Sequence, residues 1–207
     1  MNAIADAARP TDLARLFAAL DPLQPQAPPE PERAAAVLIA ISAPPAAAEI
    51  IFTRRAAHLS SHAGQVSFPG GRWETQDGAL HQTALREAHE ELSLPPQQVA
   101  LKGQLASRIS AKGLRVTPFV GQVPAGLKLT PCVTETAAVF RVPLRFFTQV
   151  RPVRVDCIQR ADGRARVAAW DYQGFEIWGL TAHFTEQLLA RMGLNIDYRN
   201  LPERTLG

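Results

Sequence analysis

Short apolar runs, several of them rich in β-branched residues, recur along the chain and predict strands. Two of them lie at residues 34–42 and 49–55 and are separated by the proline-containing loop APPAAA. The stretch GQVSFPGG predicts another strand, which ends in a turn. Further strands are predicted at residues 99–107, 114–123, 136–144, 151–159 and 165–172.

Two segments with helical periodicity predict the main helices. One covers residues 79–92 and stops before Pro95, because a proline disfavours a helical conformation in the residue that precedes it. The other covers residues 180–193 and ends at Gly193, a residue type that is common at helix C-termini. Strands interleaved with these helices predict an α/β fold in which a mixed β-sheet is flanked by helices.

The N-terminal part has a different pattern. Thr11 is predicted to cap a short amphipathic helix over residues 11–20. The proline-dense run DPLQPQAPPEPE follows and cannot continue a helix, so it predicts an extended arm or a linker. We therefore divide the chain into residues 1–33, an N-terminal helix and Pro-rich arm, and residues 34–207, one domain. Docking of the arm onto a partner subunit, in a homodimer, is one hypothesis for its role.

Composition and charge restrict the function classes. The chain has 207 residues, of which 46% are hydrophobic and 20% charged, as is typical of a globular protein with a packed core. Its formal charge of +3 and pI near 9.2 favour an anionic ligand, but they fall far short of a surface that coats nucleic acid. We therefore expect a small-molecule partner and no nucleic acid.

Cysteines and terminal signals indicate a location. Cys132 and Cys157 match neither a zinc-site spacing nor a disulfide framework, so free reduced thiols are expected. The N-terminal MNAIADAARPTDLARL lacks the basic segment and apolar core of a secretory signal. No stretch approaches about 18 uninterrupted apolar residues. We expect a cytoplasmic protein without membrane association.

One helical segment concentrates acidic residues. At about 100° per residue, Glu87, Glu90 and Glu91 share a face roughly 100° wide. Like charges at these spacings destabilise a helix by about 0.2–0.5 kcal/mol each, and only Arg86 lies beside them. A bound cation would remove this conflict, and carboxylates without nearby cysteine favour Mg²⁺ or Mn²⁺ over Zn²⁺. The opposite side carries the predicted buried stripe, formed by Leu85, Ala88 and Leu92.

The loop before this helix narrows the interpretation. Taken alone, the acidic face is also explained by a solvated helix surface, and Pro-Gly-Gly by a common tight turn. In FPGG, however, a rigid proline precedes Gly70 and Gly71, which tolerate φ > 0 and lack side chains. Backbone there can approach a metal or a phosphate closely. The turn, the fixed gap and the three glutamates in this order point to a metal-dependent reaction on a phosphate compound.

These residues resemble a known family. The pattern of Gly71, five residues, Asp77, eight residues and then REAHEELSL resembles the Nudix box, a loop–helix–loop that holds catalytic divalent metal. Upstream, TRRAAHLSSHAGQVSFPGG resembles the signature of the coenzyme A diphosphatase branch. Downstream, GLRVTPFVG, AAVFRVPL and IWGLTA are also similar to that branch. The resemblance covers roughly residues 34–192.

Three positions depart from the family pattern. Asp77 stands where the general box has glutamate, and the gap after it is one residue longer, as is usual in this branch. Ser93 replaces the glycine near the end of the box. Ser60 stands where the upstream signature ordinarily has arginine. Because serine offers one neutral hydroxyl where arginine offers a charged fork, this last departure bears on phosphate recognition.

The resemblance implies a fold and an activity. The fold is a Nudix hydrolase domain over residues 34–207, an α/β structure with a mixed β-sheet sandwiched between helices and a loop–helix–loop catalytic motif. The activity is metal-dependent hydrolysis of the diphosphate bond of coenzyme A or acyl-CoA, giving 4'-phosphopantetheine or its acyl derivative and adenosine 3',5'-bisphosphate. The alternatives are the same chemistry on NADH, ADP-ribose or a damaged nucleotide, and a non-catalytic Nudix-like nucleotide-binding module.

The resemblance also implies roles for individual residues. The metal would be held by Glu87, Glu91, Glu90 and the carbonyl of Gly71. Catalytic roles fall to Glu90, Glu87 and Arg86, and a salt bridge from Arg86 would orient Glu87. The candidate substrate-binding residues are Arg54, Arg55, Ser60, Gly70 and Lys112. Glu135, on a loop before a predicted strand, is a candidate general base or further ligand, with a simple exposed side chain as the alternative.

Overall fold

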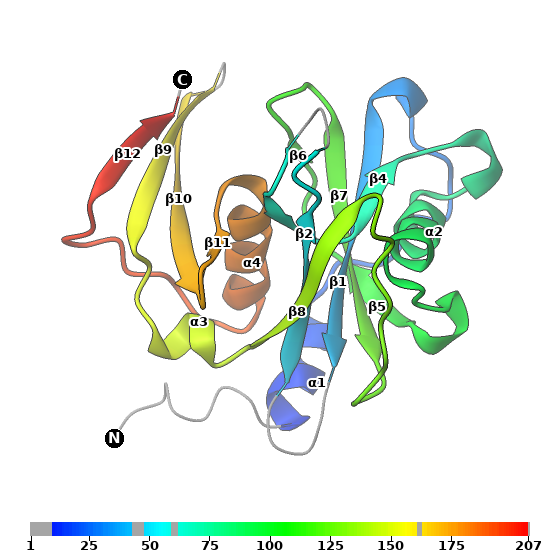
Figure 1. The fold of residues 1–207 in the computed structure, drawn as a ribbon, viewed down its shortest axis with the longest axis horizontal. Coiled ribbons are helices and arrows are strands. Elements are labelled where there is room, and N and C mark those ends of the chain that lie inside the picture. The colour runs from blue at the N-terminus through cyan, green and yellow to red at the C-terminus, as the bar shows by residue number, and fades with distance from the viewer. Residues whose placement is uncertain (1–9, 43–47, 59–61, 161–162, 207) are drawn as a thin grey trace.

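The computed structural model describes residues 10–42, 48–58, 62–160 and 163–206, and Figure 1 shows their arrangement. An eight-stranded sheet has the order β3-β2-β1-β7-β5, with β4 on β1, β6 on β7 and β8 on β2. Its strands are β1 (Ala34–Ser42), β2 (Glu49–Arg55), β3 (Val66–Ser67), β4 (Gly70–Arg72), β5 (Ala100–Gln104), β6 (Arg108–Ile109), β7 (Arg115–Val123) and β8 (Thr136–Pro143). β1 and β7 pair in parallel and the other pairs are antiparallel, so the sheet is mixed.

Helices lie on both faces of this sheet. Figure 1 shows α2 on one face and α4 on the other, between the main sheet and a smaller one. The helices are α1 (Pro10–Ala18), α2 (Leu80–Leu92), α3 (Phe146–Gln149) and α4 (Gly179–Arg191), with short 3-10 turns η1 (Pro31–Arg33), η2 (Thr75–Asp77) and η3 (Pro96–Gln98). The predicted mixed sheet between helices is confirmed.

β1 is buried on both faces, which explains its nearly continuous apolar run. Ala36 and Leu38 belong to the core on the side of α2. Ile39 and Ile41 belong to the core on the other side, together with Leu188 of α4. Because successive side chains of a strand alternate between faces, one strand supplies both cores. The predicted apolar stripe of α2 is buried as expected, at Leu85, Ala88 and Leu92.

The structure adds a second sheet that the apolar pattern did not predict. It has the order β11-β10-β9-β12 and consists of β9 (Arg154–Arg160), β10 (Gly163–Tyr172), β11 (Phe175–Ile177) and β12 (Glu203–Leu206). An apolar run predicts a strand but not its partner, and the short polar segment ERTL of β12 carries little strand signal. β12 pairs in parallel with β9, where Arg204 contacts the fully buried Asp156 at 2.8 Å.

The N-terminal helix packs into the domain. Leu13 is only 6% exposed and Leu16 is fully buried in the core beside α4. After the helix, Asp21 exchanges backbone hydrogen bonds with Gln104 and forms an ion pair with Arg191 of α4 at 2.9 Å. The helix covers Pro10–Ala18, and the predicted capping by the Thr11 side chain lies outside what the structure describes. The domain boundary at residue 34 stays a prediction.

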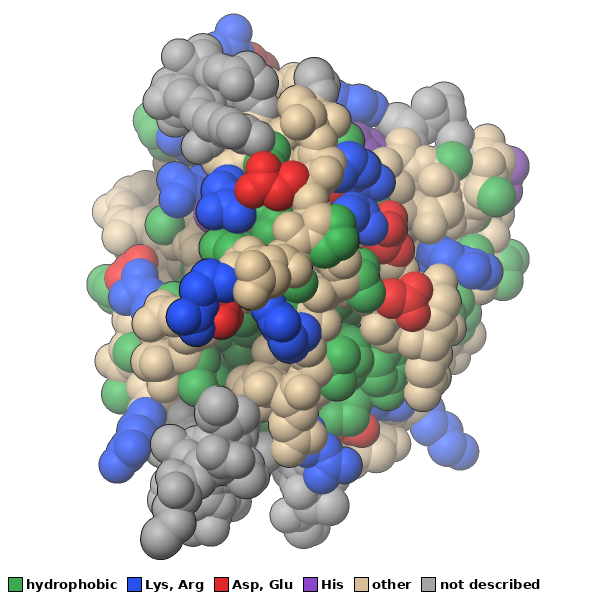
Figure 2. Space-filling model, turned by 90° about the vertical axis from the view of Figure 1, so that its left-hand side faces the viewer, with side chains coloured by type: hydrophobic (Ala, Val, Ile, Leu, Met, Phe, Trp, Pro, Cys, Tyr) green, Lys and Arg blue, Asp and Glu red, His purple; other side chains and the backbone are tan. Residues whose placement is uncertain are grey.

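Charged side chains are mixed on the face next to the smaller sheet. Figure 2 shows Lys and Arg interspersed with Asp and Glu on this face. Within the smaller sheet, Arg166 of β10 forms an ion pair with Glu203 of β12 at 2.8 Å. Cys132 and Cys157 are both free thiols. In the part of the chain that the structure describes, no helix combines the length and apolar character needed to span a bilayer.

Glu186 of α4 lies between the helix and the smaller sheet. Its carboxylate accepts hydrogen bonds from the backbone N–H of Ala168 at 2.7 Å and from the hydroxyl of Tyr198 at 2.5 Å. Burial nevertheless raises the pKa of Glu186 to about 7, since the two donors only partly compensate for lost solvation. The same burial, together with the Glu186 charge, raises the pKa of Tyr198.

We expect Leu92→Ala to lower the free energy of unfolding by about 2–5 kcal/mol, because Leu92 is fully buried against β1 and truncation leaves a cavity. Chemical denaturation of both proteins measures the difference. Val133→Ala is the matched control, since Val133 is 77% exposed and should change stability by no more than about 0.5 kcal/mol. Equal losses in the two variants would contradict the burial of this helix face.

Glu186→Gln should remove a pH-dependent part of the stability. The pKa of Glu186 is about 7 in the folded protein and near 4.5 when unfolded, so the folded state binds more protons between these values. Its contribution is therefore complete below about pH 4.5 and is lost as pH rises through about 7. Denaturation from pH 5 to pH 8 should show wild type losing on the order of 2–3 kcal/mol relative to the variant. Parallel stability curves would contradict the prediction.

Candidate active site

Two glycines of β4 bring backbone against the neighbouring strand and against α2. Gly70 pairs with Val37 and Gly71 with Ala36 of β1. A Cβ on Gly70 would lie 2.2 Å from the carbonyl oxygen of Ala36, and one on Gly71 would lie 2.2 Å from Oε1 of Glu87. Neither glycine adopts a positive φ. The chain does bend at Pro69 after β3, as predicted, but the two glycines lie in the next strand, where close packing is what excludes a side chain.

Glu91 faces inward, although the helical projection places it on the acidic face, opposite the stripe predicted to be buried. It is 4% exposed and accepts a hydrogen bond from the backbone N–H of Gly70. Burial, reinforced by the negative charge of Glu87, raises the pKa of Glu91 to about 8, although Arg55 acts in the opposite direction. Helical projection gives only the angles between side chains, not the rotation of the helix against the sheet. In this structure the side of α2 that carries Glu91 packs beneath β4. Glu90 is the member of the acidic face that meets solvent.

Glu87 lies between the buried Glu91 and the solvent-exposed Glu90. Burial raises its pKa, while the ion pair with Arg86 lowers it, and the net shift is upward. The negative charges of Glu90 and Glu135 add to the upward shift. Two neighbouring carboxylates, Glu87 and Glu91, therefore both carry a cost for being ionised in the metal-free protein.

Arg86 is the hub of the site. Its Nε and Nη2 donate to the two carboxylate oxygens of Asp77 at 2.8 and 3.1 Å. Nη1 donates to Glu87 at 3.0 Å and to Glu90 at 3.1 Å, and Nη2 also donates to the carbonyl oxygen of Arg72 at 3.0 Å. The expected salt bridge between Arg86 and Glu87 is thus present. All the N–H groups of this guanidinium are used within the protein.

Asp77 anchors the hub, a role that sequence analysis did not assign to it. Its side chain also accepts hydrogen bonds from the hydroxyl of Thr83 at 2.8 Å and the backbone N–H of Glu74 at 3.0 Å. Burial acts to raise the pKa of Asp77, but these hydrogen bonds and the one from Arg86 outweigh it, so the pKa lies below its usual value. The sequence signal that could have indicated this role is that Asp77 occupies the acidic position of the Nudix-like pattern.

Arg55 reaches the buried carboxylates from β2. The pairing of β2 with β8 shifts register between Arg54 and Arg55, and such bulges re-aim side chains. The charge of Arg55 lowers the pKa of Glu91, so the two side chains are close. Within the described residues, its buried Nε has no hydrogen-bond partner. Arg54 lies elsewhere, over the ring of Phe175 at 5.5 Å.

The loop before β8 closes the end of α2 and carries Glu135. The backbone N–H groups of Thr130 and Cys132 donate to the carbonyl oxygens of Leu92 and Glu91, at 2.9 and 2.8 Å. These carbonyls would otherwise lack helical partners. The Glu135 side chain is exposed, and its charge raises the pKa of both Glu87 and Glu91. The structure therefore brings the candidate base to the carboxylate pair.

The remaining predicted positions do not contact the carboxylates in the described structure. Ser93 caps α2 with φ 54°, a left-handed conformation in which glycine would be less strained. Lys112 lies on the loop between β6 and β7 and lines a pocket that it shares with Arg72. Ser60 falls outside the described residues.

The carboxylates suit a hard divalent cation. Glu87 and Glu91 offer only oxygen donors, and a bound cation would offset the burial and the neighbouring negative charges that raise their pKa values. In the ranges that the structure describes, no three His, Cys, Asp or Glu side chains are arranged to hold a metal ion by themselves. A cation bound here would take further ligands from water or substrate phosphate.

Comparison with known proteins identifies the family. The model of the NUDIX domain matches residues 32–137. The chain belongs to the Nudix hydrolase family. It is 43% identical over 175 residues to the Uncharacterized Nudix hydrolase NudL of Photorhabdus laumondii, covering 82% of this chain and 93% of that one. Its identity to NudL of Salmonella paratyphi B is 38% over 164 residues, covering 79% and 84%.

Solved Nudix structures align with part of the fold. The Nudix hydrolase RenU of M. smegmatis aligns with a TM-score of 0.48 at 24% identity, covering 56% of this chain and 74% of that one. The Nudix domain of Shewanella oneidensis NrtR, solved with ADP-ribose, aligns with a TM-score of 0.44 at 19% identity, covering 66% and 86%. Nudix hydrolases act on nucleoside diphosphate derivatives and generally need a divalent metal.

We expect Glu91→Gln to reduce metal-dependent hydrolysis by about a hundredfold or more, because the amide keeps the shape and the acceptor for Gly70 but removes a ligand charge. The metal-free variant should melt at about the wild-type temperature, because burial raises the pKa of Glu91 to about 8 and the amide therefore replaces a carboxylic acid that is mostly neutral at about pH 7. Calorimetric titration with Mn²⁺ should show weakened binding.

The matched control is Glu49→Gln, at the opposite end of β2 from Arg55, which should keep wild-type turnover and metal affinity. Full turnover in Glu91→Gln would contradict the metal-ligand role of this residue, whatever the melting temperature.

Proposed function

We propose that this Nudix hydrolase cleaves the diphosphate bond of coenzyme A or an acyl derivative, with Mg²⁺ or Mn²⁺ as cofactor. One observation carries the proposal: FPGG, the end of the segment that resembles the coenzyme A diphosphatase branch, contacts the acidic helix. Gly71 leaves room for the Glu87 carboxylate, and Gly70 donates its N–H to Glu91. The segment linked to substrate choice and the metal carboxylates thus belong to one site.

The roles follow from the contacts. Glu87 and Glu91 would hold the cation, with Glu90 beside them and the carbonyl of Gly71 as a further candidate ligand. A divalent cation bound there supplies neutralisation of the diphosphate charge and a bound water of lowered pKa. Arg86 acts as a positioning residue rather than a phosphate ligand, because its N–H groups are already used on Asp77, Glu87, Glu90 and the Arg72 carbonyl.

Arg55 and Glu135 are the groups available to the substrate. Arg55 is partly exposed and its charge acts on Glu91, so the terminal N–H groups of its guanidinium can donate to a diphosphate oxygen bound beside the carboxylates. Glu135 is exposed beside the carboxylate pair and can accept the proton of the attacking water. Attack at phosphorus forms one P–O bond and breaks the bond to the bridging oxygen. The products are 4'-phosphopantetheine, or its acyl derivative, and adenosine 3',5'-bisphosphate.

The two rival functions differ in what they require. Hydrolysis of NADH, ADP-ribose or a damaged nucleotide would use the same carboxylates, since these groups meet the diphosphate and not the rest of the substrate. A non-catalytic binding module would gain nothing from two neighbouring carboxylates whose ionisation is unfavourable without a cation.

A substrate panel with identification of products tests the proposal. Coenzyme A, acetyl-coenzyme A, NADH and ADP-ribose are incubated with Mg²⁺ and, separately, with Mn²⁺. We expect the highest kcat/KM for coenzyme A or acetyl-coenzyme A, with both phosphate monoesters found by mass spectrometry. Cleavage of ADP-ribose or NADH without cleavage of either coenzyme A compound would overturn the substrate assignment, while the Nudix chemistry would stand.

A further inference from the structure

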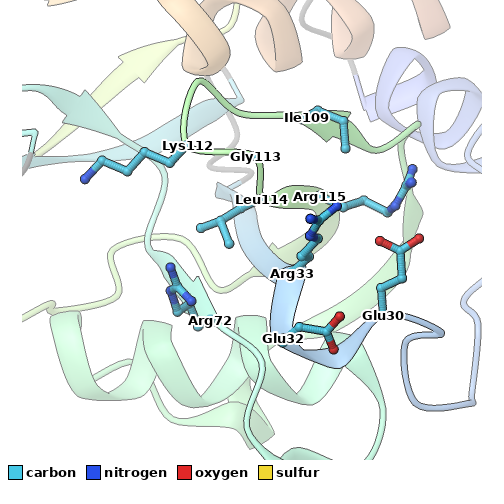
Figure 3. A pocket seen from close by; sticks show the side chains of 9 residues that line it. All are labelled: Glu30, Glu32, Arg33, Arg72, Ile109, Lys112, Gly113, Leu114 and Arg115. Carbon is cyan, nitrogen blue, oxygen red and sulfur yellow. The ribbon is translucent and has the colours of Figure 1, made fainter.

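A basic pocket lies next to the carboxylate site. It has a volume of about 490 Å³ and is formed by η1, β4 and the loop between β6 and β7 (Figure 3). Its lining includes four cationic side chains: Arg33, Arg72, Lys112 and Arg115. Three distant segments of the chain supply them, so sequence alone does not group them.

The fold joins this pocket directly to the active site. Arg72 follows Gly71 in β4, and its carbonyl oxygen accepts a hydrogen bond from Arg86 at 3.0 Å. β4 and β7 flank the start of β1, where Ala35 pairs with Arg72 and Ala34 with Arg115. A substrate whose diphosphate meets Glu87 can therefore extend from β4 into the pocket.

The cations of the pocket are not neutralised within the described structure. No described carboxylate forms an ion pair with Arg33, Arg72, Lys112 or Arg115, whereas Arg86 is fully engaged. Glu30 and Glu32 also line the pocket, and Figure 3 shows the Glu30 carboxylate toward Arg115, away from Arg72 and Lys112. The end beside β4 is thus the basic one.

We propose that this pocket binds a phosphate monoester carried by the substrate outside its scissile diphosphate, and that it selects nucleotides bearing such a group. The inference rests on the proposed function, in which the group is the 3'-phosphate of coenzyme A. A phosphate monoester is close to dianionic at neutral pH and matches two or more cations, with arginine as a bidentate donor. NADH and ADP-ribose lack this group, so the pocket would discriminate against them.

The kinetic test compares coenzyme A with dephospho-coenzyme A, which differ only in the 3'-phosphate. We expect the ratio of kcat/KM for the two compounds to favour coenzyme A and to fall about tenfold or more in Arg33→Ala and in Lys112→Ala, since each removes a charge-assisted hydrogen bond. Arg145→Ala is the matched control, because Arg145 is an exposed arginine outside the pocket, and it should keep the wild-type ratio. An unchanged ratio in both pocket variants would overturn the proposal.

A binding test separates this inference from the proposed function. Adenosine 3',5'-bisphosphate and adenosine 5'-monophosphate are titrated calorimetrically into metal-free protein, which requires no turnover. Wild type should bind the bisphosphate about tenfold more tightly, and Arg33→Ala should lose that preference while it retains the wild-type melting temperature. If coenzyme A is not hydrolysed but this preference appears, the substrate assignment fails and the pocket stands. Equal affinities in wild type would overturn the pocket.

Discussion

The buried pairing of Arg86 with Asp77 is the interaction on which the site depends. Two hydrogen bonds of 2.8 and 3.1 Å fix the guanidinium plane, and the remaining donors then set Glu87, Glu90 and the Arg72 carbonyl around it. Removing one partner of such a pair leaves an uncompensated charge, which costs far more than the pair contributes. The arrangement thus connects the loop after β4 to α2 and fixes the orientation of the Glu87 and Glu90 side chains.

Burial around Arg86 makes ionisation of the neighbouring carboxylates unfavourable, and this prepares the site to bind a cation. Glu91 is held under β4 by the fit of Gly70 and Gly71 against β1 and α2, where ionisation is unfavourable. The packing of the fold therefore holds the Glu91 carboxylate in a buried position, although solvent would favour its ionised form. A divalent cation converts this cost into affinity, because the negative charges that repel one another attract the ion.

Much of the fold could be predicted from the sequence, because apolar period and turn residues determine local structure. The helix of the site and its buried stripe at Leu85 and Leu92 follow directly from 3.6-residue spacing. Spacing cannot give the rotation of the helix against the sheet, so it did not show that Glu91 on the acidic face is buried. Nor can it group Arg33, Arg72 and Lys112, whose proximity depends on β1 lying between β4 and β7. The second sheet escaped prediction because strand partners are long-range.

The loop that carries Glu135 also completes the hydrogen bonding of α2, through the amides of Thr130 and Cys132. Transient opening of this loop would free the last helical carbonyls and move Glu135 away from the carboxylate pair at the same moment. Hydrogen exchange of the Thr130 and Cys132 amides should therefore report on the site, since their protection factors measure how often the loop opens from the end of α2. The position of Glu135 and the hydrogen bonding at the end of α2 are therefore gained and lost together.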